Sequence, residues 1–371
     1  MNAIKQLEQD YQTRAQAMVG AVSAPRISCA EPWSIKLWAN AFDPKNPLYH
    51  DESYAASTSW GSLIAPPLYQ ECMTLTSWNA PIPPELGHLS HGAFQLPFML
   101  GEEWEFYQPV RAGEHYQIYR NTPKLTKDDS DDSDSVIRYT NMTHDVDLLD
   151  SQGQKVSNCK CYLRMWLSHR EIPRLEPAPY RYTQNQLSHI DEVYHQEIIR
   201  GSRTRTIEEV SVGEKLPDAV LGPTTVWDML VMTVGRQDQE LLPMMALKDQ
   251  PNAPSAPDPV TNIPKCFMEC HLANDTAHQL GLPNAIHAGA VDRSLLIRIV
   301  TNWMGDDGFI TRFAWQPLKD TFVGDTLFAS AWVTDVDKAA GLCSINAMLQ
   351  NQKGVKTAAA QITVRLPNHH S

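Results

Sequence analysis

Between Asp43 and Ala55 the sequence gathers side chains that can exchange protons with a substrate or with water. The stretch holds the imidazole of His50, three carboxylates including those of Asp43 and Asp51, and the amide of Asn46. A carboxylate and a histidine within hydrogen-bond reach of one water molecule can act as general base and general acid. The same residue types also favour turns and helix N-caps, so a structural interpretation of the stretch stays open.

A related stretch follows in the other half of the chain. Residues 49–67 align without a gap to residues 271–289, and this alignment places Tyr49 opposite His271. Two further pairs also match, GQKVSNCKCYLRM with GVKTAAAQITVRL and VRAGEHYQIY with TFVGDTLFAS, and each joins a glycine turn to an alternating strand. The sequence therefore predicts an internal repeat, with the same order of elements in both halves.

The elements that must position these side chains are predicted from hydrophobic periodicity. Each half is expected to hold an approach helix, a turn with the motif, a central helix and about four long strands. Ser34 and either Thr224 or Thr225 are expected N-caps. Approach helices are expected at 31–42 and 222–235, and central helices at 66–78 and 288–305.

A core helix wrapped by antiparallel strands, present twice, predicts an α+β protein. We expect an N-terminal domain over residues 1–167 and a C-terminal domain over residues 193–371. The proline- and charge-rich residues 168–192 are expected to form the linker between them.

Composition narrows the classes of protein to consider. The 371 residues carry a net charge of −12, which argues against a nucleic-acid binder, because such proteins present a basic face to phosphates. No apolar run approaches the roughly 18 residues of a membrane-spanning helix, and residues 1–20 lack the apolar core of a signal peptide. Seven scattered cysteines suit reduced thiols. We therefore expect no membrane contact and a cytoplasmic location.

Candidate metal ligands are few. The cysteine pairs at 159–161 and 266–270 lack further ligands at a recognisable spacing. The acidic run at 126–135 lacks the glycine and the closing glutamate of a helix–loop–helix calcium motif. We expect no metal site, and we expect a solvated loop for the acidic run.

The motif stretches "NPLYHDESYA…WGSLIAPP" and "HLANDTAHQLGLPNAIHAG" resemble the MaoC-like dehydratases, which include the (R)-specific enoyl-CoA hydratases. The resemblance extends over about residues 25–160 and 195–366. It implies a double hotdog, in which each half wraps a curved antiparallel sheet around a long helix. It also implies addition of water to a 2-enoyl thioester, or its removal. In the family, the aspartate and the histidine of the motif hold the water, and backbone N–H groups at the central helix polarise the thioester carbonyl.

In the first half the family motif is present but altered. Asn46 falls on it, and Asp43 lies near the family aspartate with one extra residue before Asn46. Tyr49 stands where the family has its histidine, and His50 is shifted by one position. The resemblance implies catalytic roles for Asp43 and His50, and substrate contacts for Asn46, Tyr49 and Gly61. The alternatives are a turn cap for Asp43, a solvated turn residue for His50 and a packing residue for Tyr49.

The second half has the opposite alteration. His271 takes the position of the family histidine, whereas Cys266 stands where the aspartate should be. A proline-rich insertion over residues 236–265 precedes His271, and Asp238 at its start is the candidate for the missing carboxylate. Gly289 matches the last glycine of the motif and is implied in substrate binding. The structural alternative for His271 is a buried histidine bonded between helix and sheet.

Three functions from different classes remain open at this point. The first is a hydratase or dehydratase of an acyl thioester on CoA or another carrier, with His271 as the principal catalytic residue. The second is a catalytically silent hotdog protein that binds an acyl group or supports an active partner. The third is a hotdog thioesterase. Hydration requires no redox cofactor and no nucleotide-binding glycine motif is present, so we expect no cofactor. A homodimer or a hetero-oligomer with another hotdog protein is possible in each case.

Overall fold

The fold is taken from a computed structural model of the chain. It describes residues 13, 19–20, 22–25, 27–74, 98–122, 124–127, 137–168, 180–237, 242–249, 255–258, 260–279 and 282–368. Asp238, most of the acidic run at 126–135, and residues 75–78 of the first expected central helix lie outside this part of the chain.

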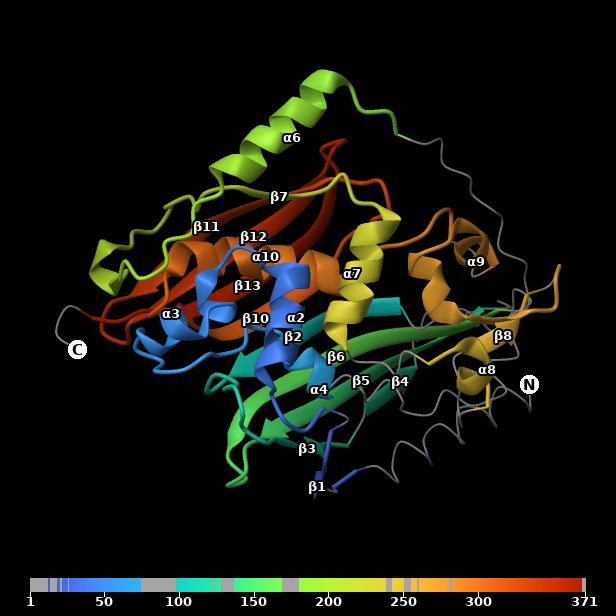
Figure 1. The fold of residues 1–371 in the computed structure, drawn as a ribbon, viewed down its shortest axis with the longest axis horizontal. Helices are drawn as coiled ribbons and strands as arrows, with labels where there is room; N and C mark the ends of the chain where they lie inside the picture. Colours follow the sequence, from blue (N-terminus) through green and yellow to red (C-terminus); the bar gives the residue numbers. More distant parts are fainter. Residues whose placement is uncertain are drawn as a thin grey trace.

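One antiparallel sheet of eleven strands runs through both halves of the chain (Figure 1). Along the sheet the order is β1, β3, β5, β6, β2, β10, β13, β12, β11 and β7, with β4 beside β5. The bounds are β1 Val22–Ser23, β2 Phe98–Phe106, β3 Gln117–Arg120, β4 Lys124–Lys127, β5 Ile137–Leu149, β6 Lys155–Ser168, β7 Ala219–Leu221, β10 Phe309–Pro317, β11 Leu327–Asp337, β12 Leu342–Asn351 and β13 Lys356–Arg365. A separate hairpin consists of β8 Ser255–Pro257 and β9 Pro264–Cys266.

The two halves meet where β2 pairs with β10, with Phe313 opposite Trp104. From this joint outward, the N-terminal half has the order β2–β6–β5–β3 and the C-terminal half has the order β10–β13–β12–β11. In both halves the first long strand is therefore followed by the fourth, the third and the second. Isolated bridges repeat this correspondence, since Ile64 pairs with Arg111 and Ile286 pairs with Phe322.

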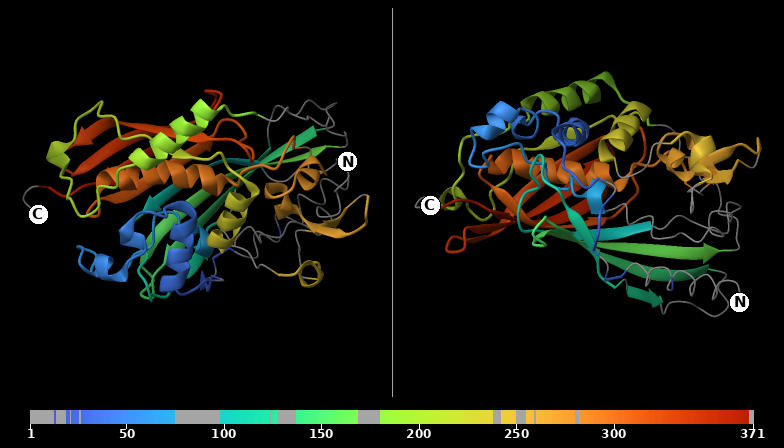
Figure 2. Two further views of the ribbon diagram at one scale, coloured as in Figure 1. Left: turned by 45° about the horizontal axis from the view of Figure 1, so that its top comes forward. Right: turned by 60° about the horizontal axis from the view of Figure 1, so that its bottom comes forward.

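The helices lie on one side of the sheet and around its rim (Figure 2). Their bounds are α2 Pro32–Phe42, α3 Glu52–Ala56, α4 Glu71–Thr74, α6 Gln184–Gln196, α7 Val226–Arg236, α8 Met244–Leu247, α9 Asn274–Gln279 and α10 Gly289–Met304. The described part of the chain also holds the 3₁₀ turns η1 Pro47–Tyr49, η3 Ile207–Glu209 and η4 Phe267–His271. No described helix is both long and apolar enough to cross a membrane.

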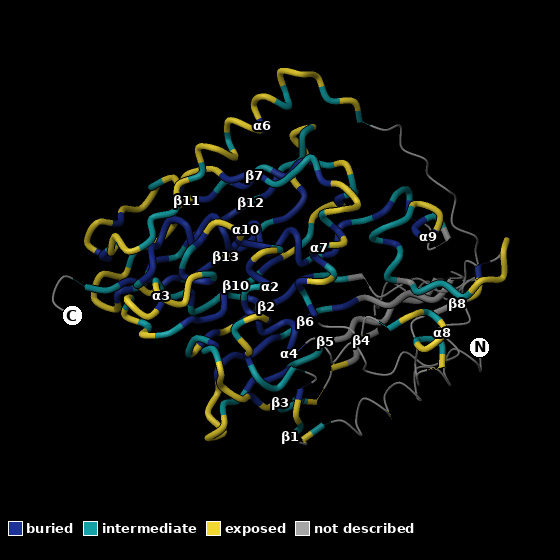
Figure 3. The backbone as a smooth tube through the Cα atoms, viewed as in Figure 1, coloured by how far each residue is buried: buried dark blue, intermediate teal, exposed yellow. Residues whose placement is uncertain are grey.

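Helix α10 is the centre of the core, and residues 290–304 are all buried (Figure 3). It contacts strands of its own half and also α2 of the other half. Strand β12 shows why the sheet covers it, because buried and half-buried residues alternate along the strand and Ile345, Ala347 and Leu349 all face one side. Because this helix is buried on nearly every face, its polar residues as well as its apolar ones face protein and not solvent.

Helices α2 and α7 pack against each other across the two halves. Gly235 permits their close approach, because a Cβ on that residue would lie 2.5 Å from Ala41 Cβ. The side chain of Ser34 lies inside α2 and donates to Gln237 at 2.8 Å. The expected N-cap at Ser34 is wrong, because α2 begins after Glu31 with a proline at its first position, and Ser34 lies within the first turn of the helix. Thr225 caps α7 as expected.

Helix α6 begins inside the expected linker. Thr183 forms a capping box with Gln186 at the start of this helix. A capping box satisfies N–H groups at a helix start, so a helix with few buried residues can form despite weak periodicity.

Cys159 and Cys161 are both buried on β6, as the alternation of that strand predicts. The domain boundaries themselves stay a prediction.

Candidate functional site

His271 and Tyr49 occupy corresponding places in the two halves. Tyr49 ends the 3₁₀ turn η1, and the short helix α3 begins at Glu52. His271 ends the 3₁₀ turn η4, and the short helix α9 begins at Asn274. The ungapped alignment of the two stretches therefore describes the same local backbone, with a phenol in one half and an imidazole in the other.

The ring of His271 is oriented by the main chain. Its Nδ1 lies 2.7 Å from the carbonyl oxygen of Ile286. A carbonyl can only accept, so Nδ1 carries the proton and the lone pair is on Nε2. Burial lowers the pKa of His271 to about 4, and the nearby positive charge of Arg236 acts in the same direction. The imidazole is therefore neutral at pH 7, with Nε2 as a base.

The carbonyl that holds His271 lies just before the start of α10. Ala288 is the N-cap of that helix and makes no side-chain hydrogen bond to it. The first N–H groups of a helix have no partner within it and carry a partial positive charge, so they can bind a developing oxyanion. Gly289 opens the helix, and a Cβ there would lie 3.2 Å from Trp315 and 3.3 Å from Arg293. A larger residue at this position would require these two side chains to move by a few tenths of an ångström.

A second histidine lies beside the same helix start. His287 is buried, and its Nε2 lies 2.7 Å from the hydroxyl of Thr224. Its Nδ1 lies 3.9 Å from a carboxylate oxygen of Asp292. Thr321 in turn donates to Asp292 at 3.4 Å. The hydrogen bond with Thr224 orients the ring of His287. Asp292 lies in the first turn of α10, where the helix dipole stabilises its negative charge.

Two arginines and two glutamates form a buried ionic cluster against this end of α10. Arg293 lies 2.6 Å from Glu71 and 2.9 Å from Glu102. Arg236, the last residue of α7, lies 3.8 Å from the other oxygen of Glu71. Burial raises the pKa of Glu71 to about 7, against the positive charge of Arg293. Both glutamates belong to the N-terminal half and both arginines to the C-terminal half, so the cluster joins the two.

In the first half, Asp43 and His50 make contact, but not through the carboxylate. Nε2 of His50 lies 2.9 Å from the backbone carbonyl of Asp43. The carboxylate instead accepts from Thr301 on α10 at 3.5 Å and from Asn46. Asn46 also caps η1 by accepting from the backbone of Leu48. His50 therefore binds the main chain of Asp43, and not its carboxylate as expected.

Asp43 is nevertheless an unusual carboxyl group. It is only 5% exposed, and its Oδ1 has no hydrogen-bond partner. Burial raises the pKa of Asp43 to about 7, although the positive charge of Arg298 opposes the shift. Arg298 also lies 2.9 Å from Glu197. Tyr49 is buried beside this group, and burial together with the charge of Asp43 raises the pKa of its phenol well above 10.

The two candidate groups lie at opposite ends of α10. Asp43 contacts Thr301, whereas His271 is bonded next to the helix start at Gly289. Twelve residues separate Gly289 from Thr301 along the helix, which corresponds to about 18 Å. Asp43 and His271 therefore do not form one acid–base pair.

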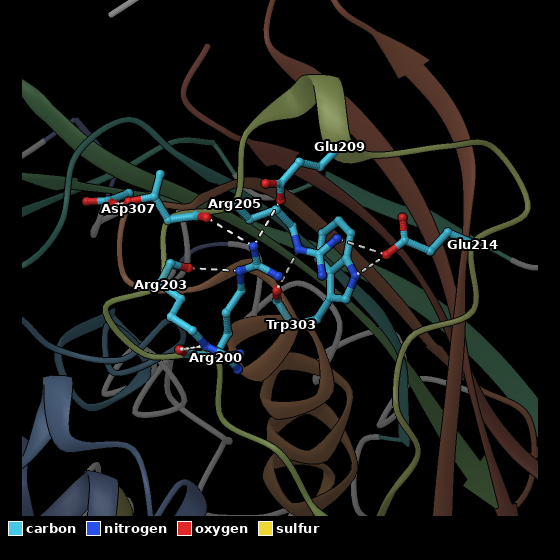
Figure 4. A network of polar contacts seen from close by, with 8 residues as sticks. Arg200, Arg203, Arg205, Glu209, Glu214, Trp303 and Asp307 are labelled. Atoms are coloured by element: carbon cyan, nitrogen blue, oxygen red, sulfur yellow. Dashed lines mark hydrogen bonds and ion pairs between the residues drawn. The ribbon is translucent and has the colours of Figure 1, made fainter. Parts of the chain in front are cut away.

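The far end of α10 is held by the segment that follows α6 (Figure 4). Arg205 donates to the carbonyl of Trp303 at 3.0 Å and to Glu214 at 2.9 Å. Arg200 donates to Glu209 at 2.9 Å in the same network. Every group in this network has a structural partner, so we assign no chemistry to it.

The remaining expected site residues are placed as follows. Asp43 is the C-cap of α2, and the C-cap of α7 is Gln237. Gln237 is the amide counterpart of Asp43, and Asp238 lies outside the described residues. Gly61 is exposed, and a Cβ on it would have no neighbouring atom within 4 Å. Among the described residues, no group of three or more His, Cys, Asp or Glu side chains could hold a metal ion.

Sequence reasoning missed Glu71 and Arg236. Glu71 lies in the stretch "PPLYQECMTLTSW", which was expected to form an apolar core helix. A glutamate within such a pattern was the available signal, because a buried carboxylate needs a partner. Its arginine partners are more than 160 residues away in the sequence, so pattern alone could not identify them.

Comparisons with known proteins agree on one kind of fold. A family model described as "FAS1-like, dehydratase domain region" matches residues 17–147. A protein named "Probable enoyl-CoA hydratase alpha subunit" from Thermomonospora curvata is 23% identical over 130 residues. That match covers 32% of this chain and 41% of the relative, so the chain spans less than half of the length of the curated relative.

Solved structures match over almost the whole chain. One titled "MaoC-like dehydratase" has a TM-score of 0.63 at 15% identity, and covers 95% of this chain and 100% of its own. A putative MaoC domain dehydratase from Chloroflexus aurantiacus has a TM-score of 0.54 at 11% identity, with 95% and 96% covered. A Mycobacterium tuberculosis protein titled as a double hotdog has a TM-score of 0.54 at 8% identity, with 94% and 96% covered. The expected α+β double hotdog fold is confirmed.

Proposed function

We propose that this chain, which has the double hotdog fold of the MaoC-like dehydratases, is a hydratase or dehydratase that acts on a 2-enoyl thioester. The comparisons support the hydratase or dehydratase class. The acyl-CoA substrate and the site residues are part of the proposal. One observation carries it: His271 is held as a neutral imidazole by the carbonyl of Ile286, three residues before the uncapped start of α10 at Gly289.

The reaction uses two features of this site. Nε2 of His271 takes a proton from water while the water oxygen forms a bond to C3 of the enoyl group. The electron pair of the double bond moves to the thioester oxygen, and the N–H groups at Gly289 and Ala290 stabilise that enolate. The imidazolium of His271 then returns the proton to C2. Dehydration follows the same steps in reverse.

Asp43 is proposed to belong to a separate site in the N-terminal half. That site has the carboxyl group but has Tyr49 in place of a histidine. We propose Asp238 as the carboxylate partner of His271, and Asn46 and Gly289 as substrate contacts. His50 is bonded to main chain, which favours a role in holding the motif turn.

The direct test is an assay of purified full-length protein with a short and a bulky trans-2-enoyl-CoA. Loss of the conjugated enoyl absorbance measures hydration, and a thiol reagent measures release of CoA. We expect hydration, and we expect His271→Gln to lower kcat about 10²- to 10⁴-fold. His195→Gln is a matched control, because Nδ1 of His195 also lies 2.7 Å from a backbone carbonyl but on the exposed helix α6. Full activity of His271→Gln would refute the assignment.

A second candidate function is a silent acyl-binding protein or partner subunit. It is favoured by the distribution of residues between the halves, since Gln237 replaces the carboxyl of Asp43 and Tyr49 replaces the imidazole of His271. A wild-type protein that binds a saturated acyl-CoA in calorimetry, yet turns over neither enoyl-CoA, would support this candidate. Thiol release would instead indicate a thioesterase.

A further inference from the structure

Glu71 is a buried carboxylate that the proposed reaction does not use. It belongs to α4 of the N-terminal half and has no exposed surface. One of its oxygens accepts from Nε of Arg293 at 2.9 Å and lies 2.6 Å from Nη2 of the same residue. The other oxygen has no hydrogen-bond partner and lies 3.8 Å from Nε of Arg236. Glu71 is thus shared between two arginines from different helices of the other half.

Both arginines border the site around His271. A Cβ on Gly289, the first residue of α10, would lie 3.3 Å from Nη1 of Arg293, so this guanidinium lies against the start of the helix. Arg236 ends α7, and its charge contributes to the lowered pKa of His271. Arg293 therefore lies against the helix start whose N–H groups the reaction needs, and the charge of Arg236 acts on its base.

Charge also favours a joint role. Arg236 and Arg293 bring two positive charges to this part of the core, and Glu102 and the ionised form of Glu71 offset them. Glu102 contacts Arg293 at 2.9 Å and also accepts from Trp104. Glu71 contacts both arginines, so its removal would leave both guanidinium groups less firmly positioned.

We infer that Glu71 is a positioning residue, contributed by the N-terminal half, that fixes Arg236 and Arg293 around the C-terminal site. It acts through these arginines and does not touch the substrate. The inference rests on the proposed function for its kinetic consequence, but not for the coupling between Glu71 and His271.

The kinetic part of the test uses Glu71→Gln, which keeps the shape of the side chain and removes its charge. We expect kcat to fall about 10²-fold, because small displacements in a catalytic site have effects of this size. KM should change little, because Glu71 makes no contact with substrate. Glu71→Asp, which keeps the charge on a shorter side chain, replaces it if the glutamine variant does not fold. Glu214→Gln is the control, since it removes the ion pair with Arg205 near the far end of α10 (Figure 4).

The second part needs no activity. A double-mutant cycle combines Glu71→Gln with His271→Gln and follows unfolding in urea. Glu71 lies 3.8 Å from Arg236, and the charge of Arg236 acts on His271. We therefore expect a coupling of at least about threefold in the unfolding equilibrium constant, whereas independent sites are additive. The cycle of Glu214→Gln with His271→Gln should be additive.

Each outcome decides the inference. A lower kcat together with a coupled cycle supports it. An active wild type with unchanged kcat in Glu71→Gln overturns it and leaves the proposed function standing. An inactive wild type defeats the proposed function, and the cycle then decides alone: coupling supports the link from Glu71 to His271, and additivity overturns it. An additive cycle overturns it in an active protein as well.

Discussion

Replacing Asp43 by asparagine isolates the effect of one buried carboxyl group on the pH dependence of stability. The pKa of Asp43 is raised from 3.8 to about 7 in the folded protein, with burial as the main cause. The unfolded chain therefore loses this proton near pH 4, whereas the folded protein keeps it up to about pH 7. Between these limits the folded state binds more protons, so its stability falls as pH rises.

The size of the effect follows from the same shift. Each pH unit between the two pKa values corresponds to about 1.36 kcal/mol, so the whole window corresponds to about 4 kcal/mol. The contribution is fully present below pH 4 and is lost as pH approaches 7. Asparagine cannot ionise, so Asp43→Asn should gain about 3 kcal/mol in unfolding free energy relative to wild type between pH 5 and pH 8.

Urea unfolding of both proteins at several pH values between 5 and 8 provides the measurement. The quantity of interest is the difference between the two unfolding free energies at each pH, because contributions from other groups cancel in it. Asp335→Asn, at an exposed position of β11, is the matched control. A difference between wild type and Asp43→Asn that stays constant over this range would refute the reasoning, because Asp43 would then be ionised in the folded protein throughout.

Three further substitutions test the packing that supports the site. Arg293→Met leaves two buried carboxylates without their shared cation and should cost about 3–5 kcal/mol in urea unfolding; unchanged stability would contradict the ionic cluster. Gly101→Ala should cost about 1–3 kcal/mol, because a Cβ at Gly101 would lie 2.6 Å from the carbonyl oxygen of Trp315 at the joint of the sheet; an unshifted melting temperature would argue against this close approach. Tyr54→Phe loses a 2.6 Å bond to Asp306, and a loss of about 1.5 kcal/mol is expected, whereas no change in a thermal melt would show that the bond contributes nothing.

The parts of the fold that were predictable depend on local patterns. Periodicity and glycine turns located α2, α7 and α10 and the strands of the second half, because each element repeats its pattern over several turns or residues. The repeat of the motif placed Tyr49 and His271 at equivalent positions, and both end a 3₁₀ turn. The N-cap at Thr225 was predictable from residue type, whereas Ser34 faces Gln237 from the other half, and this partner overrides the cap preference.

The candidate site was less predictable because its contacts are long-range. Sequence indicated His271 but not the carbonyl of Ile286 that selects its tautomer. Asp43 and His50 are neighbours in sequence, yet the carboxylate of Asp43 accepts from Thr301 on α10 and from Asn46, and not from His50. Glu71 gave no signal beyond its presence in an apolar stretch. Such pairings depend on how the two halves pack against each other, and the sequence pattern of one half does not reveal that packing.

The pairing of β2 with β10 has a consequence for how this chain can change over time. Two separate hotdog chains must find each other at their prevailing concentration, and a weakened edge would let them part. Here both strands belong to one chain, so their pairing is intramolecular and does not depend on the protein concentration. Assembly of the sheet then no longer depends on identical halves. A residue of one half can therefore be replaced without the same change at the equivalent position of the other half. Tyr49 differs in this way from His271, and Gln237 from Asp43.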